Sequence, residues 1–105
     1  MFNKKKSNVI YQKGKGFKKV DSRSSIVGEP NTNIDFYDIQ TGNLVMRRKI
    51  NDKGVAQKDL DKGHKTHNYQ DHAHDYYDKK RGNERPLSKK EKRELKKASK
   101  KRRFP

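Results

Sequence analysis

The sequence contains no cysteine, which excludes disulfide bonds and any metal site built from thiolates. No apolar run approaches the ~20 residues that a transmembrane helix needs, and the first residues lack the apolar core of a secretion signal. Only 27% of the 105 residues are hydrophobic, which is enough for one small domain but not for an extensive core. We therefore expect a single cytosolic or virion-enclosed domain, with part of the chain disordered when free.

Acidic residues are scarce, and the excess positive charge lies at the two ends of the chain. Lys and Arg number 29 against 13 Asp and Glu, which gives a formal net charge of +16. Residues 1–20 hold seven lysines and no acid, residues 79–105 hold fourteen Lys or Arg and three Glu, and residues 21–78 are nearly neutral. Basic blocks of this kind favour nucleic acid as a partner, either RNA or DNA. The candidate nucleic-acid-binding residues are Lys4, Lys5, Lys6, Lys18, Lys19, Arg48, Lys96, Lys97, Lys100, Lys101, Arg102 and Arg103.

Short segments separated by turn residues predict the fold. The segments 34–39, 44–50 and 55–60 are rich in β-branched or apolar residues, and glycine-containing turns separate them. The predicted fold class is small α+β: a three-stranded antiparallel meander with a His-rich loop, a C-terminal basic helix and a disordered basic N-terminal arm. The predicted parts are a disordered arm at 1–25, a small β-rich domain with the His cluster at 26–80, and a basic helix or tail at 81–105.

Alternation along the second segment separates its side chains into two faces. Leu44, Met46 and Ile50 are predicted to lie on one apolar face, and Arg47 and Lys49 on the opposite, partly basic face. If the histidine loop folds back over the basic face, Arg47 would stand beside the histidines. We therefore predict that Arg47 stabilises a phosphate there.

The two ends of the chain differ in their predicted structure. Within the N-terminal arm, one short strand at 8–11 is the only ordered element that we expect. At the other end, Ser88 followed by Glu91 forms a capping-box pattern, which predicts a helix running to about Lys101. Its apolar stripe is thin, so we expect a partner or a polyanion to stabilise it. The stripe consists of Leu87, Leu95 and Ala98.

All four histidines of the chain lie within eleven residues, at His64, His67, His72 and His74. Imidazole has an ordinary pKa near neutrality and is the commonest metal ligand. His72 and His74 are two residues apart, so a strand would present both rings on one face. His64 and His67 are three apart, which places them on one side of a helical turn. The candidate catalytic residues are His72, His74, His67 and Arg47, and the candidate metal ligands are His64, His67, His72 and His74.

The residues leave three interpretations of the histidine cluster open. With Asp71 and Asp75, the imidazoles suffice for a site for Zn²⁺ or another divalent metal such as Mn²⁺. Without metal, one imidazole could abstract a ribose 2′-hydroxyl proton while a second protonates the leaving oxygen. In the third interpretation, the histidines lie in solvent or stack with neighbouring tyrosines.

Seven different short patterns follow one another along residues 26–78. They are Gly28-Glu29-Pro30-Asn31, Asp35-Phe36-Tyr37-Asp38, Thr41-Gly42-Asn43-Leu44, Arg47-Arg48, Asp52-Lys53-Gly54-Val55, Lys58-Asp59-Leu60-Asp61 and His72-Ala73-His74. Together they resemble the small C-terminal module of phage head-morphogenesis (minor capsid) proteins and of bacterial polymorphic toxins. The resemblance implies a nuclease or toxin tip in which the four histidines have a role. It also implies a bacterial cytoplasmic or virion location, with phage head proteins or an acidic immunity protein as partners.

The sequence thus predicts a basic protein of a phage or mobile element that binds nucleic acid. If the protein is an enzyme, the prediction is a small toxin-like nuclease whose active site is the cluster from His64 to His74. Two alternatives have no catalysis. One is a structural protein of a phage head or a nucleoprotein particle, and the other is an RNA-binding accessory of the translation machinery.

Overall fold

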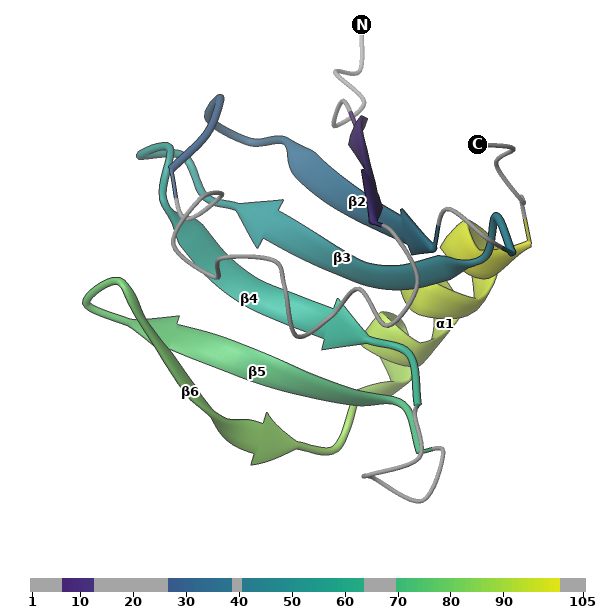
Figure 1. The fold of residues 1–105 in the computed structure, drawn as a ribbon. Helices are drawn as coiled ribbons and strands as arrows, with labels where there is room; N and C mark the ends of the chain where they lie inside the picture. The colour runs from purple at the N-terminus through teal and green to yellow at the C-terminus, as the bar shows by residue number, and fades with distance from the viewer. Residues whose placement is uncertain (1–6, 13–26, 39–40, 64–69, 101–105) are drawn as a thin grey trace, which may run out of the picture.

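In a computed structural model, the protein folds into a six-stranded sheet with one helix packed across one of its faces (Figure 1). The structure describes residues 7–12, 27–38, 41–63 and 70–100. The elements are β1 (Ser7–Gln12), β2 (Asn33–Asp38), β3 (Leu44–Ile50), β4 (Ala56–Asp61), β5 (His72–Tyr77), β6 (Lys80–Arg85) and α1 (Lys89–Ser99). The strands lie side by side in chain order; β1 runs parallel to β2, and every other neighbouring pair is antiparallel.

The predicted three-stranded meander was wrong in its number of strands. β2, β3 and β4 correspond to the three predicted segments, but β5 and β6 extend the antiparallel sheet. His72–Tyr77 is therefore a strand, although the histidine segment was expected to be mainly loop. Residues 7–12 form β1, which confirms the short strand that was expected at 8–11 within the N-terminal arm. The expected boundary between residues 80 and 81 falls inside β6.

The hairpin of β5 and β6 was missed because its turn carries unusual residues. Asp78 and Lys79 both have positive φ, 51° and 65°, as a tight two-residue hairpin turn requires, and Asn-Gly is the pair that usually marks it. Gly82 lies inside β6 opposite a register shift in β5. A Cβ atom there would lie 2.9 Å from the carbonyl oxygen of Asp75, so the close approach of the two strands requires glycine.

Apolar side chains form one cluster on each face of the sheet. Under α1 lie Tyr37, Leu44, Leu60, Ala73, Leu87 and Leu95, with Ala98 packed against them. On the other face lie Ile34, Phe36, Met46, Ile50 and Ala56, with Tyr76 packed against them. The predicted shared face of Met46 and Ile50 is confirmed. Leu44 packs instead under α1, because the register shifts between Phe36 and Tyr37 and pairs Tyr37 with Leu44.

The helix begins as predicted and packs on the sheet of the same chain. The Ser88 side chain accepts a hydrogen bond from the backbone N–H of Glu91, and the Glu91 carboxylate accepts one from the N–H of Ser88. This confirms the capping box. α1 ends at Ser99, close to the predicted end. Leu95 is almost fully buried against the sheet, which supplies the packing that the thin apolar stripe was expected to obtain from a partner.

Candidate functional site

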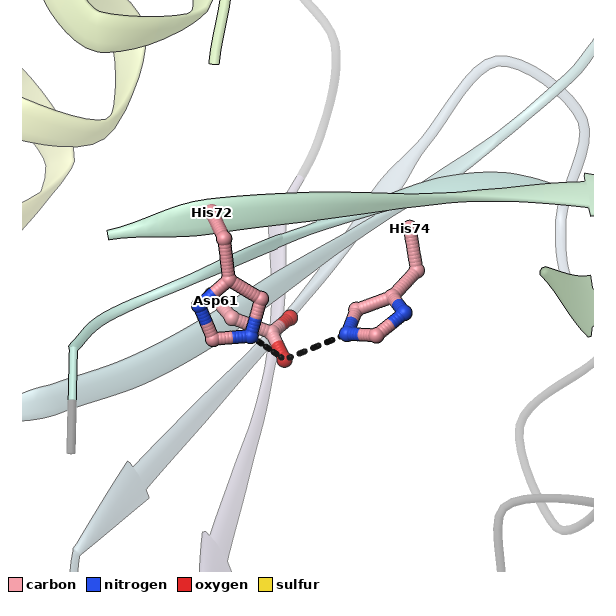
Figure 2. A group of neighbouring side chains, drawn as sticks. All are labelled: Asp61, His72 and His74. Atoms are coloured by element: carbon pink, nitrogen blue, oxygen red, sulfur yellow. Dashed lines mark ion pairs between the residues drawn. The ribbon is translucent and has the colours of Figure 1, made fainter. Parts of the chain in front are cut away.

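Asp61, His72 and His74 converge on the sheet face that α1 does not cover (Figure 2). Asp61 ends β4 and pairs in register with His72, which begins β5; His74 follows two residues later on the same face. The Nε2 atoms of His72 and His74 lie 3.4 and 3.7 Å from Oδ2 of Asp61. The two rings meet edge to face with their centroids 5.1 Å apart. The prediction that His72 and His74 share one strand face is confirmed, and we call these three residues the Asp-His group.

Backbone carbonyl groups orient both imidazole rings. Nδ1 of His72 lies 3.0 Å from the carbonyl oxygen of Gln70, and Nδ1 of His74 lies 2.9 Å from that of Gly82. A carbonyl oxygen can only accept a hydrogen bond, so each Nδ1 carries the proton. In the neutral ring, Nε2 therefore presents its lone pair toward Asp61.

Charged neighbours shift the pKa values of Asp61 and His72. Asp61 and His72 are only 3% and 5% exposed. The contact with Asp61 raises the pKa of His72, and this effect outweighs the burial that would lower it. Burial by itself would raise the pKa of Asp61, but His72 and the guanidinium of Arg81 outweigh it and lower that pKa. Arg81 donates from Nη2 to Oδ2 of Asp61 at 2.8 Å and from Nε to Oδ2 of Asp59 at 2.9 Å.

A buried ion pair lies next to the Asp-His group. Arg48 and Asp59 are 2% and 0% exposed, and Arg48 donates from Nε and Nη2 to the two carboxylate oxygens at 2.8 and 3.2 Å. The guanidinium of Arg48 also lies 5.4 and 5.5 Å from the ring centroids of Phe36 and Tyr76. Arg48 was predicted to bind nucleic acid, and this prediction was wrong, because a buried and paired guanidinium cannot reach a phosphate.

Arg47 does not join the histidines. It lies on the opposite face, where it donates to both carboxylate oxygens of Asp35 at 2.7 and 2.9 Å and to Glu94 of α1 at 3.3 Å. Asp35 and Glu94 raise the pKa of Arg47 further although burial opposes them, so it stays charged. The predicted placement of Arg47 beside the histidines was therefore wrong. His64 and His67 lie outside the described residues.

The carboxylate of the Asp-His group was missed by the sequence argument. Asp71 and Asp75 were the predicted acidic members, but Asp71 pairs with Lys62 and Asp75 with Arg85. Asp61 takes their place. The sequence feature that could have indicated Asp61 is the spacing of Asp59 and Asp61, which are two residues apart in β4. The two histidines of β5 have the same spacing, and the pairing of the strands places Asp61 opposite His72.

The outer face of α1 is a second candidate site. Both glutamates of α1 turn toward the sheet: Glu91 pairs with Arg85 and Lys58 at 2.8 Å each, and Glu94 pairs with Lys49 at 2.5 Å as well as with Arg47. The basic residues of α1 and Lys100 after it are all exposed, and we call them the α1 basic face. They are Lys89, Lys90, Lys92, Arg93, Lys96, Lys97 and Lys100.

The α1 basic face contains three of the predicted nucleic-acid-binding residues, Lys96, Lys97 and Lys100. The others, apart from Arg48, lie outside the described residues. They are Lys4, Lys5, Lys6, Lys18, Lys19, Lys101, Arg102 and Arg103.

No family model matches this chain, and neither the curated proteins nor the solved structures contain a match to it. The resemblance to phage head-morphogenesis and toxin modules therefore stays a prediction. Within the ranges that the structure describes, no helix is long and apolar enough to cross a membrane. What the protein does must be argued from its own residues.

Proposed function

We propose that this protein binds nucleic acid through the α1 basic face and its basic chain ends, in a bacterial cytoplasm or a virion. The observation that carries the proposal is the sorting of charge around α1. Both glutamates of the helix are paired with the sheet, and seven cations remain on the outside. A helix of eleven residues is about 16 Å long, so these cations are dense enough to contact several phosphates.

The internal ion pairs matter because they keep the outer cations available. Four basic residues of the sheet neutralise Glu91 and Glu94 on the side of α1 that faces the sheet. They are Arg47, Lys49, Lys58 and Arg85. Among the described residues, no ion pair is formed by any of the seven outer cations. Their charge is thus presented to solvent, where these cations can neutralise phosphates and release the counterions of a nucleic acid.

Binding of this type should depend strongly on salt and weakly on sequence. Lysine and arginine contacts to phosphates position a protein but carry no base information. Each neutralised phosphate of duplex DNA adds about −0.9 to the slope of log affinity against log salt. We expect a steep slope for random duplex DNA and a shallower one for single-stranded RNA, because the counterion density of a single strand is lower.

Charge-matched variants of the full chain test the role of α1. The variant Arg93→Gln, Lys96→Gln and Lys97→Gln should reduce the steepness of the salt slope by about two to three units. The control removes three exposed lysines: Lys53 in the turn after β3, Lys79 in the turn after β5, and Lys80 at the start of β6. Both turns lie far from α1 (Figure 1). The control should leave most of the slope in place. An equal loss in both variants would mean that net charge alone drives binding, and would overturn the role of α1.

A nuclease centred on the Asp-His group is the second candidate function. The convergence of two imidazoles and a carboxylate favours it, since such a set can move protons or hold a metal-bound water. Purified protein should then cleave RNA or DNA with turnover, and His74→Gln should abolish cleavage but leave binding by α1 intact. Binding without any turnover would instead favour a non-catalytic protein of a phage head or a nucleoprotein particle.

A further inference from the structure

We propose that Asp61, His72 and His74 bind one divalent transition-metal ion of the zinc type, and that Glu84 completes its coordination. The Asp-His group lies on the sheet face opposite α1 (Figures 1 and 2). The inference is therefore independent of the proposed binding of nucleic acid by the helix, and it holds whether or not the protein cleaves its partner.

The separations of the donor atoms fit a tetrahedral ion. Ligand atoms roughly 2.0–2.2 Å from zinc at tetrahedral angles lie roughly 3.3–3.6 Å from one another. The Nε2 atoms of His72 and His74 lie 3.4 and 3.7 Å from Oδ2 of Asp61. Both separations are within a few tenths of an ångström of such a value, and the ligand atoms of all three residues lie within 4.8 Å of one another.

The hydrogen bonds around the rings suit metal ligands. Both Nδ1 atoms are held by backbone carbonyls, which is the outer contact that fixes the tautomer of metal-bound histidines. When both rings are neutral, the two Nε2 lone pairs face a carboxylate, and a cation bound between these three donors would be stabilised by all of them. Two imidazoles with a carboxylate suit Zn²⁺ and its neighbours, whereas Mg²⁺ and Ca²⁺ prefer oxygen ligands.

Asp61 retains binding capacity despite its contact with Arg81. The guanidinium of Arg81 uses Oδ2 of Asp61 and is shared with Asp59. Oδ1 of Asp61 is buried and has no hydrogen-bond partner among the described residues. A buried carboxylate oxygen without a donor is costly, so the Asp61 carboxylate has unused capacity for a cation in addition to its contact with Arg81.

Glu84 is placed to supply the fourth ligand. It is the register partner of His74 on β6, and its Oε2 lies 3.8 Å from Nε2 of His72. Its side chain is 52% exposed, so it can turn inward without loss of buried packing. Together the four residues form a set of two nitrogen and two oxygen ligands on three adjacent strands.

Titration of the full chain with Zn²⁺ after removal of metal by a chelator tests the site. Calorimetry at neutral pH should give one ion per chain, and saturating Zn²⁺ should raise Tm by about 10 °C. Co²⁺ in place of Zn²⁺ should give the intense visible absorption of a tetrahedral site. Absence of both Zn²⁺ and Co²⁺ uptake by the wild-type chain would overturn the proposal without any variant.

Matched variants locate the ion. His74→Gln and Asp61→Asn should abolish uptake, whereas Asp78→Asn removes a carboxylate from the exposed turn after β5 and should leave uptake unchanged. Glu84→Gln lies at an exposed position, so the protein should fold, and affinity should fall about tenfold with a changed Co²⁺ spectrum. Unchanged affinity in Glu84→Gln would overturn the fourth ligand. Uptake that survives His74→Gln but disappears in a His64→Gln and His67→Gln variant would overturn the site itself.

Discussion

Replacement of Asp59 by Asn should destabilise the protein more than any comparable change at an exposed ion pair. Asp59 is 0% exposed and accepts hydrogen bonds from Arg48, Arg81 and the Tyr76 hydroxyl. Asn preserves the shape but leaves the buried guanidinium of Arg48 without a compensating charge. Removal of one partner from a buried ion pair costs about 3–5 kcal/mol.

That cost is a large part of the stability of a small domain, which is typically about 5–15 kcal/mol. At roughly 4–8 °C per kcal/mol, Tm should fall by at least about 12 °C. The matched control is Asp71→Asn, which weakens the contact with Lys62. The Lys62 and Asp71 side chains are 36% and 37% exposed, and such a pair contributes about 0–1 kcal/mol.

Urea denaturation followed by circular dichroism provides the free energies of unfolding for both variants. The combined change Arg48→Met and Asp59→Leu removes both charges, and it should recover most of the stability, because apolar side chains can fill a buried pair's space. Arg81 would lose one partner in this variant but keep Asp61 and access to solvent. If Asp59→Asn proved as mild as Asp71→Asn, the buried pair would not contribute as we argue.

Two further predictions concern pH and the backbone. The contact with Arg85 lowers the pKa of Glu91 from its ordinary value of 4.5. Because the pKa is lower in the folded protein, the ion pair of Glu91 with Arg85 contributes its full stabilisation above pH 4.5, and this stabilisation is lost as the pH falls below 4.5 toward the lowered pKa. Acid titration should therefore show a loss of stability that is smaller in Glu91→Gln. Gly54 has a φ of 78°, and a Cβ atom there would lie 2.8 Å from the carbonyl oxygen of Gly28. Gly54→Ala should cost about 1–3 kcal/mol in urea denaturation, and a neutral result would contradict this account of the turn.

The sequence predicted the centre of the sheet better than its edges. Apolar residues and glycine turns were visible for β2 to β4, because each of these strands contributes side chains to both hydrophobic clusters. β5 and β6 carry mostly polar residues, and their pairing depends on neighbours rather than on composition. The parallel pairing of β1 with β2 joins segments about 26 residues apart, which no local pattern reveals.

The residues of the candidate sites were predictable only where local alternation along one strand decides their position. The spacing of His72 and His74 was sufficient to place both rings on one face, because strand alternation is local. The identity of the carboxylate was not predictable, since Asp61 meets them only through the pairing of β4 with β5. Alternation also placed Arg47 and Lys49 together on the face opposite Met46 and Ile50, but it could not show that the helix would cover that face.

The order of the strands has a consequence for how the chain folds. From β2 to β6, every neighbour in the sheet is also the next strand in the chain, so these contacts close short loops and can form early and quickly. The attachment of α1 is different, because the contact of Arg47 with Glu94 joins residues 47 positions apart. We expect the helix to dock after the transition state, so Glu94→Gln should accelerate unfolding in a stopped-flow chevron while the refolding rate barely changes. Release of the helix before loss of the sheet would then set the lifetime of the surface that carries the outer lysines.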